Sequence, residues 1–151
     1  MTDRLVSFGN QLVEVHLRIR EELDRIRDGV ADGLTRELRT HCLTFCSTLT
    51  RHHEGEDEGA FPVLAREYPR LAPVLEELSR DHVLIADAMT RLAEILESSS
   101  DGLGDELATV AALLETHLLY EEKKLVAALN ALDPTHTDTA HLSRATTLDA
   151  P

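Results

Sequence analysis

Apolar residues recur every three or four positions in four long stretches of this chain, the spacing of one buried face of an α-helix. The stretches run approximately over 5–30, 34–63, 71–96 and 103–125. Short breaks containing glycine, proline or serine separate them, at about 29–35, 67–70 and 98–104. Because short links between long amphipathic helices make neighbouring helices antiparallel, the pattern predicts an all-α, antiparallel up-down four-helix bundle.

The chain length and composition fit one such bundle. The chain has 151 residues, the size of a single domain, and 42% of them are apolar, enough for one hydrophobic core. After Pro134 the sequence is polar and has no helical periodicity. We therefore expect a bundle over residues 1–132 and a polar, disordered tail over 133–151.

The charge and the cysteines limit the possible partners and compartment. The formal net charge is −13. A surface this acidic repels phosphates and anionic lipid heads, so we expect neither nucleic acid nor a membrane as partner. The first ten residues lack the features of a signal peptide. Cys42 and Cys46 lie four apart on one expected helix, which suits reduced thiols better than a disulfide. These features predict a cytoplasmic protein.

Each of the four apolar stripes is interrupted by polar residues at core-facing positions. They are His16, then His52 with Glu56, then His82, and finally His117 with Glu121. A buried polar group is costly unless something satisfies it. In each His-x-x-x-Glu pair the two side chains share one helix face, so both can reach one metal ion, or two adjacent ions with the carboxylate bridging them.

The six polar residues also fall at about one depth in the expected bundle. Counting from each turn at about 1.5 Å per residue, their axial positions differ by roughly 3–6 Å. A lone core histidine is usually bonded to a backbone carbonyl, but six such residues at one level favour a shared metal site. The alternative is a metal-free hydrogen-bonded network, which would have to satisfy many buried polar groups.

The sequence HHEGED at 52–57, followed by Phe61-Pro62, resembles the first His-x-x-x-Glu motif of hemerythrin-like (HHE cation-binding) proteins, and HLLYEE at 117–122 resembles the second. The single histidines in EVHLRIR and RDHVLIA match those of the family's first and third helices. The resemblance spans roughly residues 10–130. It implies a hemerythrin-like bundle with two non-haem iron ions, terminal ligands His16, His52, His82 and His117, and bridging ligands Glu56 and Glu121. Manganese and zinc remain alternatives to iron.

Some positions leave alternatives open. His53 with Asp57 could replace His52 with Glu56 as the ligand pair, although the Phe-Pro spacing favours the latter. Tyr120 could bond to the site but is expected on its flank. Oxygen-carrying hemerythrins have a further histidine where this chain has Ala86. That departure argues against simple reversible oxygen carriage.

The resemblance implies a protein that binds or reacts with O₂, H₂O₂ or NO, a small diatomic or peroxide ligand. Catalase-like turnover, binding and sensing are all open, and no protein partner is identified. Two other readings remain: an iron- or oxygen-responsive bundle that binds a regulatory partner, and a metal-free helical interaction module. A thiol nucleophile is poorly supported, because no orienting acid stands near Cys42 or Cys46.

Overall fold

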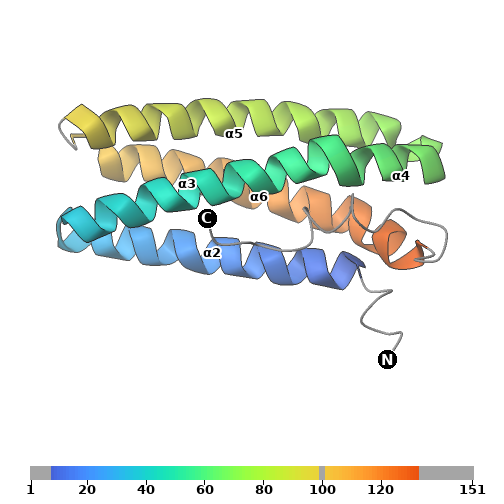
Figure 1. The fold of residues 1–151 in the computed structure, drawn as a ribbon, viewed down its shortest axis with the longest axis horizontal. Coiled ribbons are helices and arrows are strands. Elements are labelled where there is room, and N and C mark those ends of the chain that lie inside the picture. The colour runs from blue at the N-terminus through green and yellow to red at the C-terminus, as the bar shows by residue number, and fades with distance from the viewer. Residues whose placement is uncertain (1–7, 99–100, 133–151) are drawn as a thin grey trace.

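The structure is a computed structural model that describes residues 8–98 and 101–132. The tail expected over 133–151 lies outside the described residues. Four long helices run side by side (Figure 1). They are α2 (Phe8–Asp32), α3 (Arg36–Gly55), α5 (Ala72–Ser98) and α6 (Leu103–Ala131). The predicted all-α four-helix bundle is confirmed.

The helix ends that the structure describes lie where the sequence breaks predict them, and local chemistry explains three of them. After α2, Gly33 adopts a φ of 120°, a left-handed conformation that glycine tolerates without strain. Thr35 then caps α3, because its hydroxyl oxygen accepts a hydrogen bond from the Leu38 amide at 3.0 Å. Gly102, with a φ of 82°, is likewise left-handed and lies directly before α6.

The second predicted helix has an irregular middle. After α3 the chain continues through a π-helical segment, η1 (Glu56–Ala60), into α4 (Phe61–Glu67) and then a 3₁₀ turn, η2 (Pro69–Leu71). In η1 the Phe61 amide bonds to the Glu56 carbonyl, five residues back. This wider turn directly precedes Pro62, which has no amide hydrogen to continue an α-helical ladder. Single π-turns of this kind often lie at functional sites.

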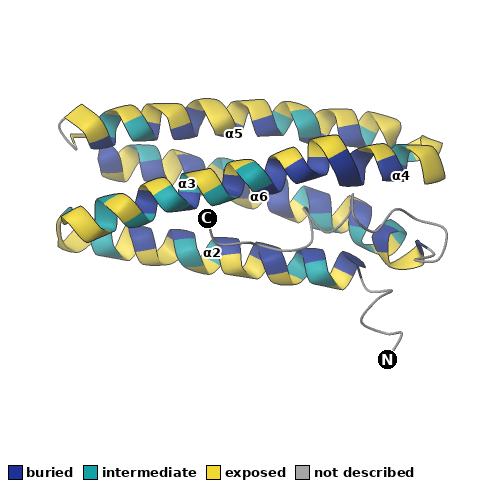
Figure 2. Ribbon diagram, in the orientation of Figure 1, coloured by how far each residue is buried: buried dark blue, intermediate teal, exposed yellow. Residues whose placement is uncertain are grey.

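The bundle interior holds two apolar clusters separated along the axis. The large apolar cluster joins α2, α3, α5 and α6 and includes Ile26, Leu49, Leu92 and Leu107. The small apolar cluster lies at the other end and joins the start of α2 to α4, α5 and the end of α6. In Figure 2 the buried residues follow one side of each long helix, as the amphipathic pattern predicts.

At the end with the small apolar cluster, α2 and α6 approach closely. A Cβ atom on Gly9 would lie 2.3 Å from the Val126 carbonyl oxygen, so only glycine fits there. The Asn130 side chain of α6 accepts hydrogen bonds from the Gly9 and Asn10 amides at 2.8 and 3.3 Å. It thereby caps the N-terminus of a neighbouring helix.

Among the described helices, none combines the length and the apolar composition needed to cross a membrane.

Candidate metal centre

A layer of polar side chains lies between the two apolar clusters, and we call it the polar layer. Each of its members is at most 5% exposed. The members are His16 from α2, His52 and His53 from α3, Glu56 from η1, His82 from α5, and His117 and Glu121 from α6. All four long helical units of the bundle therefore contribute to one buried site.

The possible ligand atoms of the polar layer fall into two overlapping groups. The His53 group consists of His53, Glu56, His82 and His117, and the His16 group consists of His16, His52 and Glu56. Within each group, one ligand atom per residue lies within 4.8 Å of every other. Glu56 belongs to both groups, so its carboxylate stands where a bridging ligand would stand.

The two carboxylates lie between histidines of the two groups. One oxygen of Glu56 is 3.0 Å from Nε2 of His82, and the other is 3.4 Å from Nε2 of His52. Oε1 of Glu121 is 3.3 Å from Nε2 of His117 and 3.8 Å from Nε2 of His16. Each carboxylate thus faces a histidine from each group, the arrangement expected of a bridge between two ions.

Despite these short distances, the inward-facing atoms are not hydrogen-bonded. The Nε2 atoms of all five histidines and both oxygens of Glu56 and Glu121 are buried without a hydrogen-bond partner in the described structure. The contacts are close, at 3.0 to 3.8 Å, but none of them is a hydrogen bond. Leaving even one buried polar group unsatisfied costs about 1–3 kcal/mol. So many such atoms pointing at one another indicate that the layer is built to hold something between them.

Two histidines of the His53 group are oriented by carboxylates outside the layer. Nδ1 of His82 donates to Asp57 at 3.0 Å, and the Ser79 hydroxyl donates to the same Asp57 oxygen at 2.7 Å. Nδ1 of His117 donates to Asp81 at 3.1 Å. In the neutral ring, an Nδ1 hydrogen bond of this kind leaves the lone pair on Nε2, which is the nitrogen that faces the layer.

One histidine of the His16 group is oriented in the same way, but through a larger network. Nδ1 of His16 donates to Glu122 at 2.7 Å. Arg20 donates to the same Glu122 oxygen at 3.1 Å and to both oxygens of Glu115, at 2.9 and 3.3 Å. The charge of Glu122 is therefore shared between a histidine and a guanidinium group.

Burial and mutual charge separate the pKa values of the polar layer. Burial, helped by the charge of Glu56, raises the pKa of Glu121 to about 7. Burial also disfavours the Glu56 anion, but His52 and its other neighbours outweigh that effect and hold its pKa well below the usual range. For His82, burial is outweighed by Asp57 and Glu56, which raise its pKa to about 10. Burial and the charge of His82 lower the pKa of His53.

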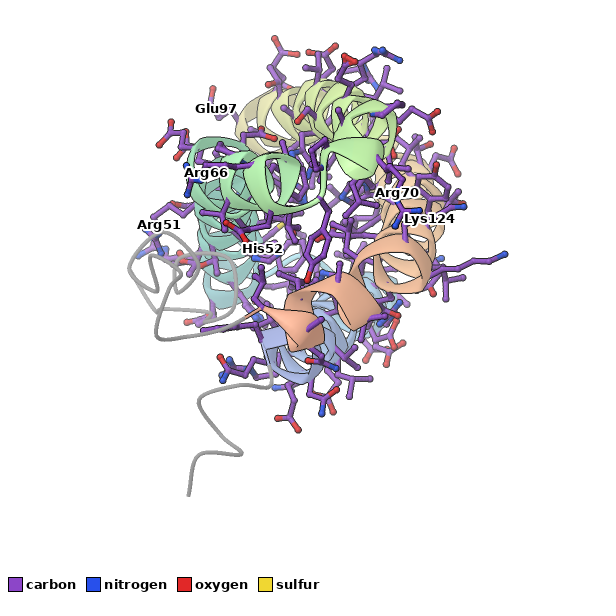
Figure 3. The ribbon with its side chains drawn as sticks, turned by 90° about the vertical axis from the view of Figure 1, so that its right-hand side faces the viewer. Arg51, His52, Arg66, Arg70, Glu97 and Lys124 are labelled. Carbon is purple, nitrogen blue, oxygen red and sulfur yellow. The ribbon has the colours of Figure 1, made fainter. Side chains whose placement is uncertain are left out.

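The structure brings together all six residues that the sequence singled out, and it adds His53. The sequence left open whether His52 or His53 is the ligand, and the structure places both of them in the buried layer. Successive residues lie about 100° apart on a helix, and the interior is wide enough at this level to receive both. Figure 3, viewed along the bundle, shows His52 directed inwards and Arg51 directed outwards. In the sequence, the sign that His53 also enters the layer was its position next to His52.

Three other expectations concern residues near the layer. Tyr120 lies on the flank as expected, where its hydroxyl donates to Glu77 at 2.9 Å. Asp57 bonds to His82 from outside the layer and does not enter it. Ala86 is exposed, whereas Ile85, Ala88 and Met89 are the buried residues of that turn. Because His53 stands beside His82 with their ring centroids 4.0 Å apart, the lack of a histidine at 86 does not leave this group short of nitrogen ligands.

The donor set fits a metal ion such as iron. Five imidazole nitrogens and two carboxylates suit iron, manganese or zinc better than a soft ion that prefers sulfur. Both cysteines are free, and Cys42 is buried in the large apolar cluster, away from the inward-facing atoms. The buried orphan atoms described above are the structural observation that supports this fit.

Comparison with known proteins agrees with this reading. A family model described as the Hemerythrin HHE cation binding domain matches residues 8–129. Searches of curated proteins and of solved structures found no significant match. The matched region includes every member of the polar layer, and the resemblance noted in the sequence is confirmed.

Proposed function

This chain belongs to the hemerythrin HHE cation-binding family, and we propose that it is a non-haem di-iron protein that binds or reacts with O₂, H₂O₂ or NO. The observation that supports the proposal most strongly is the set of inward-facing histidine nitrogens and carboxylate oxygens without hydrogen-bond partners. They fall into two groups joined by Glu56, which is what a pair of ions requires.

The residues of the polar layer would divide the work of holding two ions. His53, His82 and His117 would hold one ion and His16 and His52 the other, with Glu56 and Glu121 placed between them. When bound, a pair of iron ions supplies the redox chemistry that side chains lack. Asp57, Asp81 and Glu122 keep three of the imidazole rings in orientation. The apolar clusters on either side exclude water from the layer.

Metal uptake would also change the protonation of the layer. In the metal-free protein near neutral pH, His82, with a pKa raised to about 10, is protonated, and Glu121, with a pKa of about 7, is about half protonated. Both must lose those protons before they can act as ligands. We therefore expect metal binding to release protons and to weaken as the pH falls.

The experiment that tests the proposal is elemental analysis of protein purified from iron-supplemented cells. We expect about two irons per chain, and background iron in the double variant His52→Ala/His117→Ala. The matched control is His41→Ala, because His41 lies on the same helix as His52 but bonds to Glu22 outside the layer. If the unaltered protein contained no more metal than background, the buried histidines would be structural residues and the proposal would be wrong.

If iron is present, two assays separate the remaining functions. Iron-dependent release of O₂ from H₂O₂ identifies peroxide turnover, whereas reversible spectral change with O₂ or NO and no turnover identifies binding or sensing. A sensing role is favoured by the position of the layer, since an ion there would link all four long helices. The distinctive sign of a sensing role is a large loss of protease resistance on iron removal.

The cytoplasmic location, supported by the two free cysteines, is part of the proposal.

A further inference from the structure

The two ligand groups share Glu56 but differ in what stands behind their histidines. We propose that the two metal positions are unequal and fill in order, first the His53 group and then the His16 group, because carboxylates outside the layer strengthen the first set of ligands more than the second. This inference rests on the proposed di-metal function.

The first difference is the number of nitrogens. The His53 group offers three imidazole Nε2 atoms and the His16 group offers two, while Glu56 serves both. All else being equal, the group with one more neutral nitrogen ligand holds a divalent ion more tightly.

The second difference is the charge behind the rings. Asp57 and Asp81 accept hydrogen bonds from His82 and His117, and among the described residues these histidines are their only ion-pair partners within 4.0 Å. A carboxylate behind a ligand histidine makes the imidazole a stronger donor, and losing such a partner typically costs about 10–100-fold in metal affinity. Two histidines of the His53 group have this support.

The His16 group has weaker support at both of its histidines. Glu122, which accepts the hydrogen bond from His16, is also paired at 3.1 Å with Arg20, a cation that it shares with Glu115, so part of its charge is offset. Nδ1 of His52 is buried and has no hydrogen-bond partner in the described structure. One ligand of this group is therefore backed by a carboxylate that is shared with a guanidinium group, and the other by none.

Two conservative variants separate the positions. Asp81→Asn and Glu122→Gln each remove one negative charge and keep the shape of the side chain. We expect Asp81→Asn to weaken the first binding step by about 10–100-fold and to leave the second step nearly unchanged. We expect Glu122→Gln to act on the second step alone, with a smaller effect because Arg20 already offsets part of the charge.

The test is an anaerobic calorimetric titration of the metal-free protein with Fe(II), which yields a dissociation constant for each step and does not depend on activity. Glu77→Gln is the control, because Glu77 bonds to Tyr120 and not to a histidine of the layer. The inference is supported if the titration shows two separate binding steps, and if Asp81→Asn weakens the first step while Glu122→Gln weakens the second. Two ions binding in a single step, or the variants acting on the opposite steps, would overturn it and leave the di-metal function standing. No Fe(II) binding at all would remove the proposed function and this inference together.

Discussion

In the large apolar cluster, Leu49, Leu92 and Leu107 are each at most 2% exposed, and none of them needs a partner. Three residues after Leu49 lies His52, which is just as buried, as is Glu56 in η1, yet the inward-facing atoms of both have no hydrogen-bond partner in the described structure. The same helices thus contain a layer that stabilises the fold by burial and a layer that weakens it when nothing is bound. The difference indicates that the polar layer is maintained for binding.

The largest effect we expect comes from the apolar side of this comparison. Leu107→Ala should lower the free energy of unfolding by about 2–5 kcal/mol, because it leaves a cavity in the large apolar cluster. The loss should be the same with and without iron, since Leu107 lies ten residues before His117 on α6, about 15 Å along the helix. Chemical denaturation measures both values.

The exposed control for that variant is Leu84→Ala, since Leu84 is 54% exposed. It should change the unfolding free energy by less than about 0.5 kcal/mol. An equally large effect at both positions would contradict the assignment of stability to the buried cluster.

The next effect belongs to the polar layer and depends on pH. The pKa of Glu121 is raised from 4.5 to about 7 by burial and by the charge of Glu56. Between these values the folded protein keeps a proton that the unfolded chain releases. The contribution of Glu121 to stability is therefore fully present below pH 4.5 and is lost as the pH rises through 7, by at most about 1.4 kcal/mol per pH unit.

Glu121→Gln isolates this contribution, because glutamine has no such proton. Denaturation curves of the metal-free proteins should show the stability of the variant gaining on that of the unaltered protein between pH 4.5 and 7. A difference that stays constant over this range would mean that Glu121 does not titrate abnormally.

A smaller effect tests how the end of the bundle with the small apolar cluster holds α2 beside α6. Gly9→Ala should destabilise the protein by about 1–3 kcal/mol, because the added Cβ would meet the Val126 carbonyl. Gly104→Ala is the matched change in open space on α6, where nothing lies within 4 Å of the new atom. It should stabilise the protein by about 0.5–1 kcal/mol. Thermal unfolding of both variants measures the contrast, and equal shifts would argue against the close approach.

The smallest effect concerns the cap that α6 gives to α2. Asn130→Ala removes the oxygen that accepts from the Gly9 and Asn10 amides, and it should cost about 1 kcal/mol. Ser98→Ala, which removes an exposed hydroxyl bonded within its own helix, is the control and should have an effect below about 0.5 kcal/mol. Amide hydrogen exchange at the start of α2 should speed up in the first variant alone.

Much of the fold could be predicted from the sequence because helical periodicity and short turns determine a bundle. The shared depth of the polar layer was also predictable, since helix rise converts residue counts into distance. The π-helical turn at η1 was not, because apolar spacing is too coarse to reveal one extra residue in a turn.

Other features depended on how the helices face each other. Spacing places His52 and His53 about 100° apart but does not say that the interior is wide enough for both. Asp81 precedes His82 in the sequence, yet it bonds to His117 on the neighbouring helix. The pairing of Arg20 with Glu115 and Glu122 likewise depends on the relative position of α2 and α6. Such contacts follow from tertiary packing and not from local pattern.

The most direct test of the account is the unfolding free energy of the metal-free protein at pH 7, measured anaerobically with and without Fe(II). For each metal position whose dissociation constant is exceeded 100-fold by the free Fe(II) concentration, the account predicts that the free energy of unfolding rises by about 2.7 kcal/mol. It predicts no gain for His52→Ala/His117→Ala. Equal stability of the unaltered protein with and without Fe(II) would contradict the claim that the polar layer is a metal site.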